Sequence, residues 1–159
     1  MKIRIRDATA ADLPIIIEIY RESVLTGVSS YELDPPSDEE MVSRFAAITG
    51  QNYPYIIAED GEGKVLGYAY ASPFRTRPAY RYLAEDSVYV APDARGMGVG
   101  STLLDALMSA TADLGIRQMI AVIGVPAQLP SRCMRRPASS MSGDCRRAGS
   151  SSGNGSIRC

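Results

Sequence analysis

The sequence of 159 residues predicts one α/β (α+β) domain, in which helices cover a mixed central sheet. Three observations predict this class. Short apolar runs alternate along the chain with longer runs of helical periodicity. An Asp-Gly-Glu-Gly turn joins two strand-like runs, and a glycine-rich loop joins a third strand to a helix. The expected order is β-α-α-β-β-β-α-β over residues 1–124.

The first third of the chain supplies one strand and two helices. Residues 2–6 alternate between apolar and charged side chains, as a strand does. Residues 9–12 form a capping-box pattern and precede apolar positions at helical spacing from 13 to 24. Residues 37–40 repeat the capping pattern, and Met41, Phe45 and Ile48 give the second helix its apolar face. Both helix starts are therefore marked in the sequence.

A hairpin and a loop occupy the middle of the chain. Residues 55–59 and 65–72 read as antiparallel strands on either side of the turn at 60–63. A loop rich in arginine and tyrosine runs from 73 to 83. The next strand, around Val88, leads into the glycine-rich loop. These elements place a strand, a glycine-rich turn and a helix in succession.

The last predicted helix runs from about Val99 to Leu114, and Gly115 stands where a helix C-cap glycine belongs. Residues 118–123 form a continuous apolar run, of the kind found at the centre of a sheet. The loop before the helix can hold a phosphate, because glycines allow close approach and helix N-terminal amides attract anions. The predicted phosphate-binding residues are Arg95, Gly96, Met97, Gly98, Val99 and Gly100. The alternative is a loop that only connects a strand to a helix.

Composition excludes several classes of protein. The hydrophobic content of 45% and charged content of 22% are ordinary for a soluble domain, and no apolar run is long enough to cross a membrane. The first residues lack the apolar core of a signal peptide, so a cytoplasmic location is expected. A net charge of −1 gives no reason to expect nucleic-acid binding. The chain has no histidine, which excludes a His-based triad and a His-ligated metal, and no metal is expected.

The loop pattern Arg-x-x-Gly-x-Gly after a strand resembles the acetyl-coenzyme A loop of the GNAT acetyltransferase superfamily. It matches neither the dinucleotide fingerprint nor the P-loop. The resemblance extends over residues 3–124 and is strongest to the phosphinothricin N-acetyltransferase type. The segments that carry it include 5–13, 53–55, 67–70, 74–82, 85–90 and 121–124. It implies the GNAT fold, with acetyl-CoA as the co-substrate.

The resemblance also implies roles for individual residues. Backbone amides of residues 95–100 would cradle the coenzyme A pyrophosphate, and those of Val88, Tyr89 and Val90 would pair with the pantetheine arm and stabilise the oxyanion. Glu85, just before the strand, would be the general base, with Asp86 as its rival. The acceptor resembles an amino acid with a second anionic group. The residues that would bind it are Arg75, Arg77, Tyr80, Arg81 and Tyr82, whose alternative role is a solvated basic loop.

Residues 125–159 have a different composition from the rest of the chain. They hold six arginines, eight serines, all three cysteines and one acid, Asp144, whereas residues 1–124 carry an excess of acids. No helical or strand period runs through them. In the resembling family, one more helix and two strands follow at this point and complete the acceptor site. No family site residue is therefore assigned beyond Gly124.

Three interpretations compete for this basic tail. It is a natural disordered segment, a disulfide-bearing appendage, or the product of a frameshift; the odd cysteine count argues against the second. Reading shifted codon junctions tests the third. Cys133-Met134 must then encode His or Tyr, and Asn154-Gly155 must encode Trp or Arg. With permitted codons, the shifted frame encodes an amino-acid sequence that resembles the C-terminus of the phosphinothricin acetyltransferase type, so the frameshift is the favoured interpretation.

The predicted function is transfer of an acetyl group from acetyl-CoA to the amine of a small amino-acid-like acceptor. The resemblance implies phosphinothricin, methionine sulfoximine or methionine sulfone as acceptor, and a homodimer as the assembly. Two alternatives remain open. One is a remnant that binds coenzyme A without turnover, and the other is an interaction protein that uses its basic tail on a GNAT scaffold.

Overall fold

The computed structural model describes residues 2–26 and 32–122. Within them, five strands form one sheet in the order β1-β2-β3-β4-β5. The strands are β1 (Arg4–Asp7), β2 (Tyr55–Glu59), β3 (Val65–Pro73), β4 (Leu83–Val90) and β5 (Gln118–Ala121). The first four pair antiparallel in sequence, and β5 pairs parallel with β4. The sheet is therefore mixed, as predicted.

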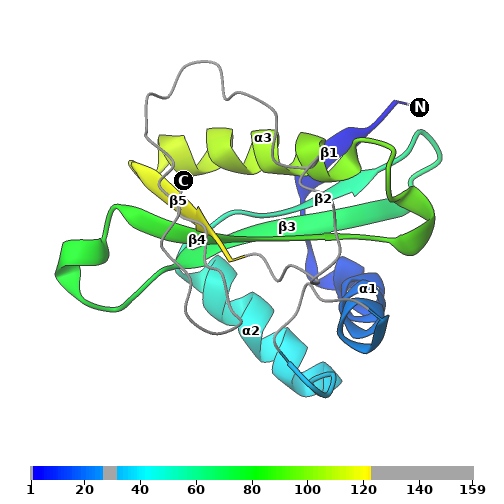
Figure 1. Ribbon diagram of the computed structural model, residues 1–159, viewed down its shortest axis with the longest axis horizontal. Helices are drawn as coiled ribbons and strands as arrows, with labels where there is room; N and C mark the ends of the chain where they lie inside the picture. The colour runs from blue at the N-terminus through cyan, green and yellow to red at the C-terminus, as the bar shows by residue number, and fades with distance from the viewer. Residues whose placement is uncertain (1, 27–31, 123–159) are drawn as a thin grey trace, which may run out of the picture.

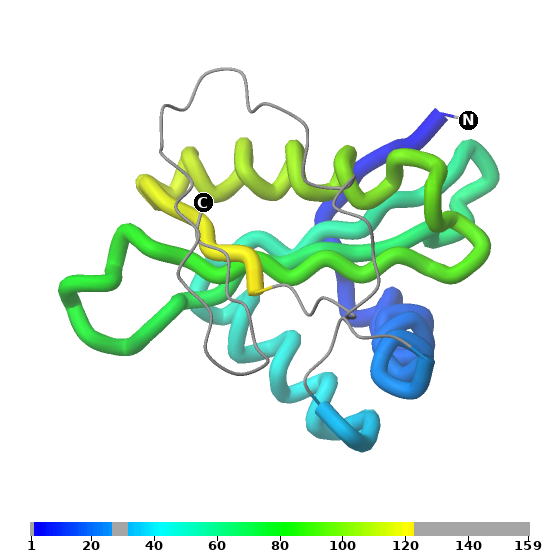
Figure 2. The backbone as a smooth tube through the Cα atoms, in the orientation of Figure 1, coloured from blue at the N-terminus to red at the C-terminus, as the bar shows by residue number. Residues whose placement is uncertain are grey.

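Helices cover both faces of this sheet. Helix α3 (Val99–Asp113) lies along one face, and α1 (Leu13–Thr26) and α2 (Asp38–Gly50) lie on the other (Figure 1). Short 3₁₀ turns η1 (Ala10–Asp12), η2 (Pro78–Tyr80) and η3 (Pro92–Ala94) complete the described elements. The tube in Figure 2 follows the chain from the long β3–β4 connection at one end of the sheet to the glycine-rich loop at the other. The predicted element order is confirmed.

Local signals fix the starts of the helices. The carboxylate of Asp12 accepts hydrogen bonds from the Thr9 backbone N–H at 2.7 Å and from Arg6, which holds the pKa of that carboxyl well below its usual range. Ser37 caps α2 by accepting from the backbone N–H of Glu40 at 3.2 Å. Both predicted caps are thus present.

Turn residues end the elements as predicted. Asp60 accepts backbone hydrogen bonds from Glu62 and Lys64 and so shapes the β2–β3 hairpin. Gly115 follows α3 with φ of +77°, the left-handed conformation that favours glycine at a helix end. One strand boundary and one strand position differ from the prediction. Strand β4 begins at Leu83, and β5 lies at one end of the described sheet rather than at its centre.

Alternation along the strands gives the two faces of the sheet different side chains. Tyr68 pairs with Tyr89 across β3 and β4, and Tyr70 pairs with Tyr55 across β3 and β2, so these rings share the face toward α1 and α2. Small residues from the same strands point toward α3. They include Gly67, Ala69, Ala71 and Ala84. The sheet therefore has an aromatic face and a small-residue face.

Candidate active site

The glycine-rich loop has the conformation expected of an anion cradle. Gly96 and Gly98 have φ of +77° and +83°, and a Cβ added to either would meet no atom within 4 Å. Gly98 is the N-cap of α3 and offers no side chain to its first amides. The N-terminal amides of a helix of 15 residues therefore face an open loop. The predicted strand, loop and helix are brought together, with η3 inserted between strand and loop.

Arg95 does not stand free at the rim of this loop. Its Nη2 lies 2.5 Å from Oε2 of Glu22, and its Nε donates to the Val90 carbonyl at 3.4 Å. Glu22 comes from α1, far away in the sequence, so no local pattern pointed to it. The ion pair ties α1 to the loop and holds the guanidinium in place.

Strand β4 is paired on both sides only over its first half. Its pairing with β5 covers Leu83 to Asp86, whereas its pairing with β3 continues to Val90. Beyond Asp86, the second edge of β4 has no strand partner within residues 2–26 and 32–122. The backbone of Val88, Tyr89 and Val90 lies along this edge and leads through η3 to the glycine-rich loop. An extended ligand could add to it as a strand does.

Glu85 and Asp86 point to opposite sides of the sheet. Glu85 lies inside β4 rather than before it, because the strand starts two residues earlier, at Leu83. It pairs with Ser72 on the aromatic face, whereas Asp86 pairs with Ala71 on the small-residue face. Burial, with the nearby charge of Glu85, raises the pKa of Asp86 to about 6. The structure thus separates the two candidate bases by strand alternation.

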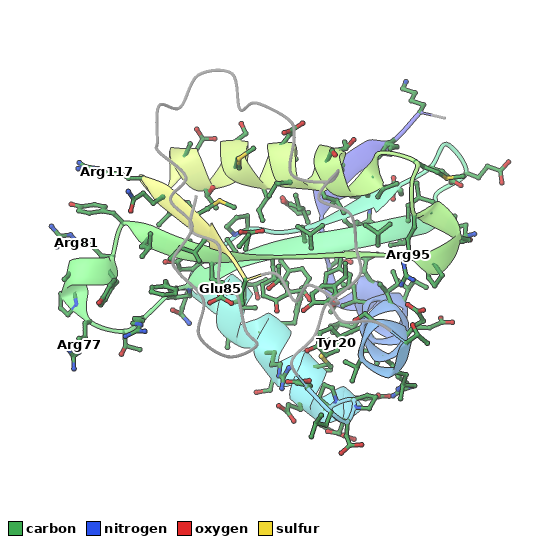
Figure 3. All side chains as sticks on the ribbon, viewed as in Figure 1. Tyr20, Arg77, Arg81, Glu85, Arg95 and Arg117 are labelled. Atoms are coloured by element: carbon green, nitrogen blue, oxygen red, sulfur yellow. The ribbon has the colours of Figure 1, made fainter. Side chains whose placement is uncertain are left out.

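The basic loop lies at the end of the sheet opposite Arg95, with Glu85 between them (Figure 3). The guanidinium of Arg75 stacks 5.8 Å from the Tyr80 ring centroid, and that of Arg81 stacks 4.4 Å from the Tyr82 ring. Arg77 is exposed at the start of η2. The predicted substrate residues are therefore clustered, with their arginines in solvent.

Sequence reasoning missed one member of this cluster. The Arg117 guanidinium also stacks on Tyr82, at 4.6 Å from the ring centroid, although 35 positions separate the two residues. The two guanidiniums lower the pKa of the Tyr82 phenol, with Arg81 as the larger cause. Parallel pairing of β5 with β4 creates this contact, so only the sheet topology could have revealed it.

A cavity of about 260 Å³ opens on the aromatic face, beneath α2. Its lining combines tyrosines with residues of α2 and one serine of β3. The lining residues are Tyr20, Met41, Arg44, Ala47, Ile48, Tyr55, Tyr68, Tyr70 and Ser72. None of them was predicted as a site residue. The alternation of Tyr68 and Tyr70 was the available signal, but it reads equally well as core.

The described residues contain neither a metal-binding cluster nor a membrane-spanning helix. No group of three or more His, Cys, Asp or Glu side chains gathers there in a way that could hold a metal ion. None of the helices in that part of the chain has the length and apolar character needed to cross a membrane.

Comparison with known proteins identifies the family. The model of the acetyltransferase (GNAT) family matches residues 15–132. The chain belongs to this family. A curated relative, phosphinothricin N-acetyltransferase from Alcaligenes faecalis, is 50% identical over 113 residues, which are 71% of this chain and 57% of the relative. The chain therefore spans little more than half the length of that GNAT protein.

Other GNAT proteins give the same picture. The L-methionine sulfoximine/L-methionine sulfone acetyltransferase of Pseudomonas paraeruginosa is 38% identical over 77% of this chain and 72% of its own length. A phosphinothricin acetyltransferase from Sinorhizobium meliloti, solved in complex with AcCoA, superposes with a TM-score of 0.76. It is 60% identical, and the match covers 78% of this chain and 67% of that chain. The family resemblance and the GNAT fold are both confirmed.

Proposed function

We propose that this chain is an acetyl-CoA-dependent N-acetyltransferase whose acceptor is the amine of a small amino acid. The observation that carries the proposal is the half-paired strand β4. Within residues 2–26 and 32–122, the edge of β4 from Ser87 to Val90 has no strand partner and runs from Glu85 toward the glycine-rich loop, so one strand joins a candidate base to an anion cradle. Named relatives that act on phosphinothricin and on methionine sulfoximine or sulfone, and a related structure holding AcCoA, support it.

The proposed roles follow from this arrangement. Amides of Gly96 to Gly100 and the α3 N-terminus would hold the pyrophosphate of acetyl-CoA, and Arg95 would border it. Glu85 would remove a proton from the acceptor's ammonium group, directly or through water, so that the amine can attack the thioester carbonyl. The new amide bond replaces the carbon–sulfur bond, and the released thiolate takes up the second proton that the attacking nitrogen loses. Amides of Val88 to Val90 would bind the carbonyl oxygen as it gains charge.

The test is acetyl transfer by the full chain. We expect coenzyme A thiol to be released when acetyl-CoA is mixed with phosphinothricin, methionine sulfoximine or methionine sulfone, and the acetylated amino acid to appear by mass spectrometry. Coenzyme A binding without transfer to any of the three would contradict the proposal and favour a remnant that only binds the co-substrate. Gel filtration with light scattering tests the homodimer that the family resemblance implies.

We further propose that residues 1–124 form the acetyltransferase part and that 125–159 are a frameshifted tail. The tail lies outside the described residues, so the proposal depends on its composition and shifted codon junctions. The nucleotide sequence around codons 124–132 tests it. A shifted frame encoding Leu-His near residues 132–134 is expected, and a shifted frame without that pair would contradict the frameshift.

A further inference from the structure

The cavity beneath α2 is a separate concavity from the glycine-rich loop and the basic loop. Its volume of about 260 Å³ lies just below the range of roughly 300–1,000 Å³ that suits drug-sized ligands, so it suits a smaller molecule. Met41 and Ile48 of α2 and the rings of Tyr55 and Tyr70 make most of the wall apolar. An aliphatic side chain would fit such a wall.

One polar group in this lining lacks a partner. The Tyr68 side chain is fully buried, and its hydroxyl oxygen has no hydrogen-bond partner within the described part of the chain. Tyr68 stacks between Tyr89, at 5.1 Å, and Tyr55, at 5.8 Å between ring centroids, so its ring is held firmly. Burial also raises the pKa of this phenol well above its usual value, and the hydroxyl therefore keeps its proton. A buried donor without an acceptor is costly, and a ligand oxygen would remove the cost.

The charges around the cavity disfavour an anion. Its one cationic lining residue, Arg44, lies 2.7 Å from Glu32 and also pairs with Glu40 one helical turn away. Two carboxylates thus balance one guanidinium. An anionic ligand group would have to compete with these two carboxylates for the one guanidinium, whereas a neutral group would not.

The cavity adjoins the candidate base. Ser72, which belongs to the lining, is the direct cross-strand partner of Glu85 on the same face of the sheet. Such partners have Cβ atoms about 4.5–5.5 Å apart. An amino acid whose amine approaches Glu85 can therefore place its side chain in the cavity.

We propose that this cavity receives the side chain of the acceptor amino acid and that the Tyr68 hydroxyl selects a neutral, oxygen-bearing tip, such as a sulfone or sulfoximine, over an anionic phosphinate. The assignment rests on the proposed function, since it requires an amino-acid acceptor at Glu85. It makes Tyr68 a specificity-determining residue. The basic loop is then left for the carboxylate of the acceptor.

The experiment compares ligand binding by the full chain with and without the hydroxyl. Isothermal titration calorimetry in the presence of coenzyme A would measure L-methionine sulfone, L-methionine and L-phosphinothricin against the wild type, Tyr68→Phe and Tyr53→Phe. Tyr53 is a half-buried tyrosine outside the cavity and serves as the matched control. The wild type should bind the sulfone most tightly. Tyr68→Phe should weaken sulfone binding about 5- to 10-fold and leave methionine unchanged, as loss of one buried hydrogen bond predicts.

Several results would overturn the inference. They are tighter binding of phosphinothricin than of the sulfone, equal losses of sulfone and methionine binding in Tyr68→Phe, the same sulfone loss in Tyr53→Phe, and no binding of either methionine compound. Thiol release is measured separately. Selective binding without acetyl transfer would contradict only the proposed function, and transfer with unchanged selectivity in Tyr68→Phe would contradict only the inference.

A second pair of variants tests the cavity without touching the buried ring. Ala47 of α2 lines the cavity and is itself exposed, and its neighbour Ala46 is exposed outside the cavity. Ala47→Phe should weaken binding of all three amino acids at least 10-fold and leave coenzyme A binding unchanged, whereas Ala46→Phe should change neither. Equal effects of the two variants, or no effect of Ala47→Phe, would overturn the inference.

Discussion

The two faces of the sheet are built from the same strands but in different ways. On the α3 side, glycine and alanine of β3 lie beneath Leu103 and Leu107, which are fully buried. On the α1 and α2 side, the strands present stacked tyrosines with centroid separations between 5.0 and 6.4 Å. One face is closely packed, and the other encloses a cavity of about 260 Å³.

This difference indicates that the two faces have separate roles, one in positioning the glycine-rich loop and the other in forming the cavity. Small side chains let α3 approach the sheet closely, which fixes the helix N-terminus and the glycine-rich loop beside β4. Rigid rings cannot fill every gap beneath α2, and the space they leave lies next to Glu85. Adjacent residues of β4 point to opposite faces of the sheet. Substituting Glu85 and Asp86 separately can therefore distinguish an effect on catalysis from an effect on packing.

The largest expected effect is on catalysis, at Glu85. Glu85→Gln removes the proposed base and should lower kcat by about 10²- to 10⁴-fold, the usual contribution of general acid–base catalysis. Asp86→Asn, the isosteric change one residue away on the opposite face, should retain activity within about threefold because the side chain does not face the acceptor. Steady-state thiol release for both variants is the measurement. Equal losses in the two would show that the faces do not divide the chemistry.

The next effect is on packing, at Gly67. A Cβ at this position would lie 2.6 Å from the Tyr89 carbonyl oxygen and 3.1 Å from the Val90 Cα, so the backbone of β4 must shift. Gly67→Ala should lower the free energy of unfolding by about 3 kcal/mol, as overpacking does. Urea denaturation measures it. Gly61→Ala in the β2–β3 turn, where an added Cβ meets nothing within 4 Å, is the control and should change little.

A smaller effect depends on pH and concerns Asp86. Because its folded pKa is raised to about 6 from 3.8, the folded state binds the proton more tightly, and this group lowers stability as pH rises between about 4 and 6. Asp86→Asn should therefore stabilise the fold by about 1.5 kcal/mol at pH 7, a figure reduced for partial exposure, and by almost nothing at pH 4. Thermal unfolding at the two pH values measures it. A stabilisation that is equal at both would contradict burial of the carboxylate as its cause.

Local chemistry in the sequence predicted most of the fold. The Thr9 and Ser37 caps, the turn at Asp60 and the left-handed Gly115 each depend on a few neighbouring residues, and each is present. The element order followed from such signals. Within the described residues, β5 lies at one end of the sheet and not at the expected centre, because an apolar run records burial and not which strands lie on either side.

The site was less predictable because its contacts are not local. The left-handed Gly96 and Gly98 were readable from one hexapeptide, but Glu22 reaches Arg95 only once α1 packs beside the loop. The Tyr68 hydroxyl has no hydrogen-bond partner among the described residues, which is a property of packing, and a tyrosine in a strand gives no sign of it. Sequence therefore located the proposed donor side of the site better than the acceptor side.

The smallest expected effect is on stability, at the N-cap of α2, and it tests whether this helix must stay intact for the cavity beneath it to bind a ligand. Ser37 is its N-cap, and Ser37→Ala removes the hydrogen bond to the Glu40 amide, which should cost about 1 kcal/mol of unfolding free energy. Ser37→Asp restores a capping acceptor and adds a favourable charge at the helix N-terminus, so it should recover the loss. Glu40 also pairs with Arg44 at the cavity. A frayed first turn should therefore weaken amino-acid binding more than coenzyme A binding, because the glycine-rich loop depends on α3 instead. Equal weakening of both ligands would mean that the two faces are coupled through the sheet.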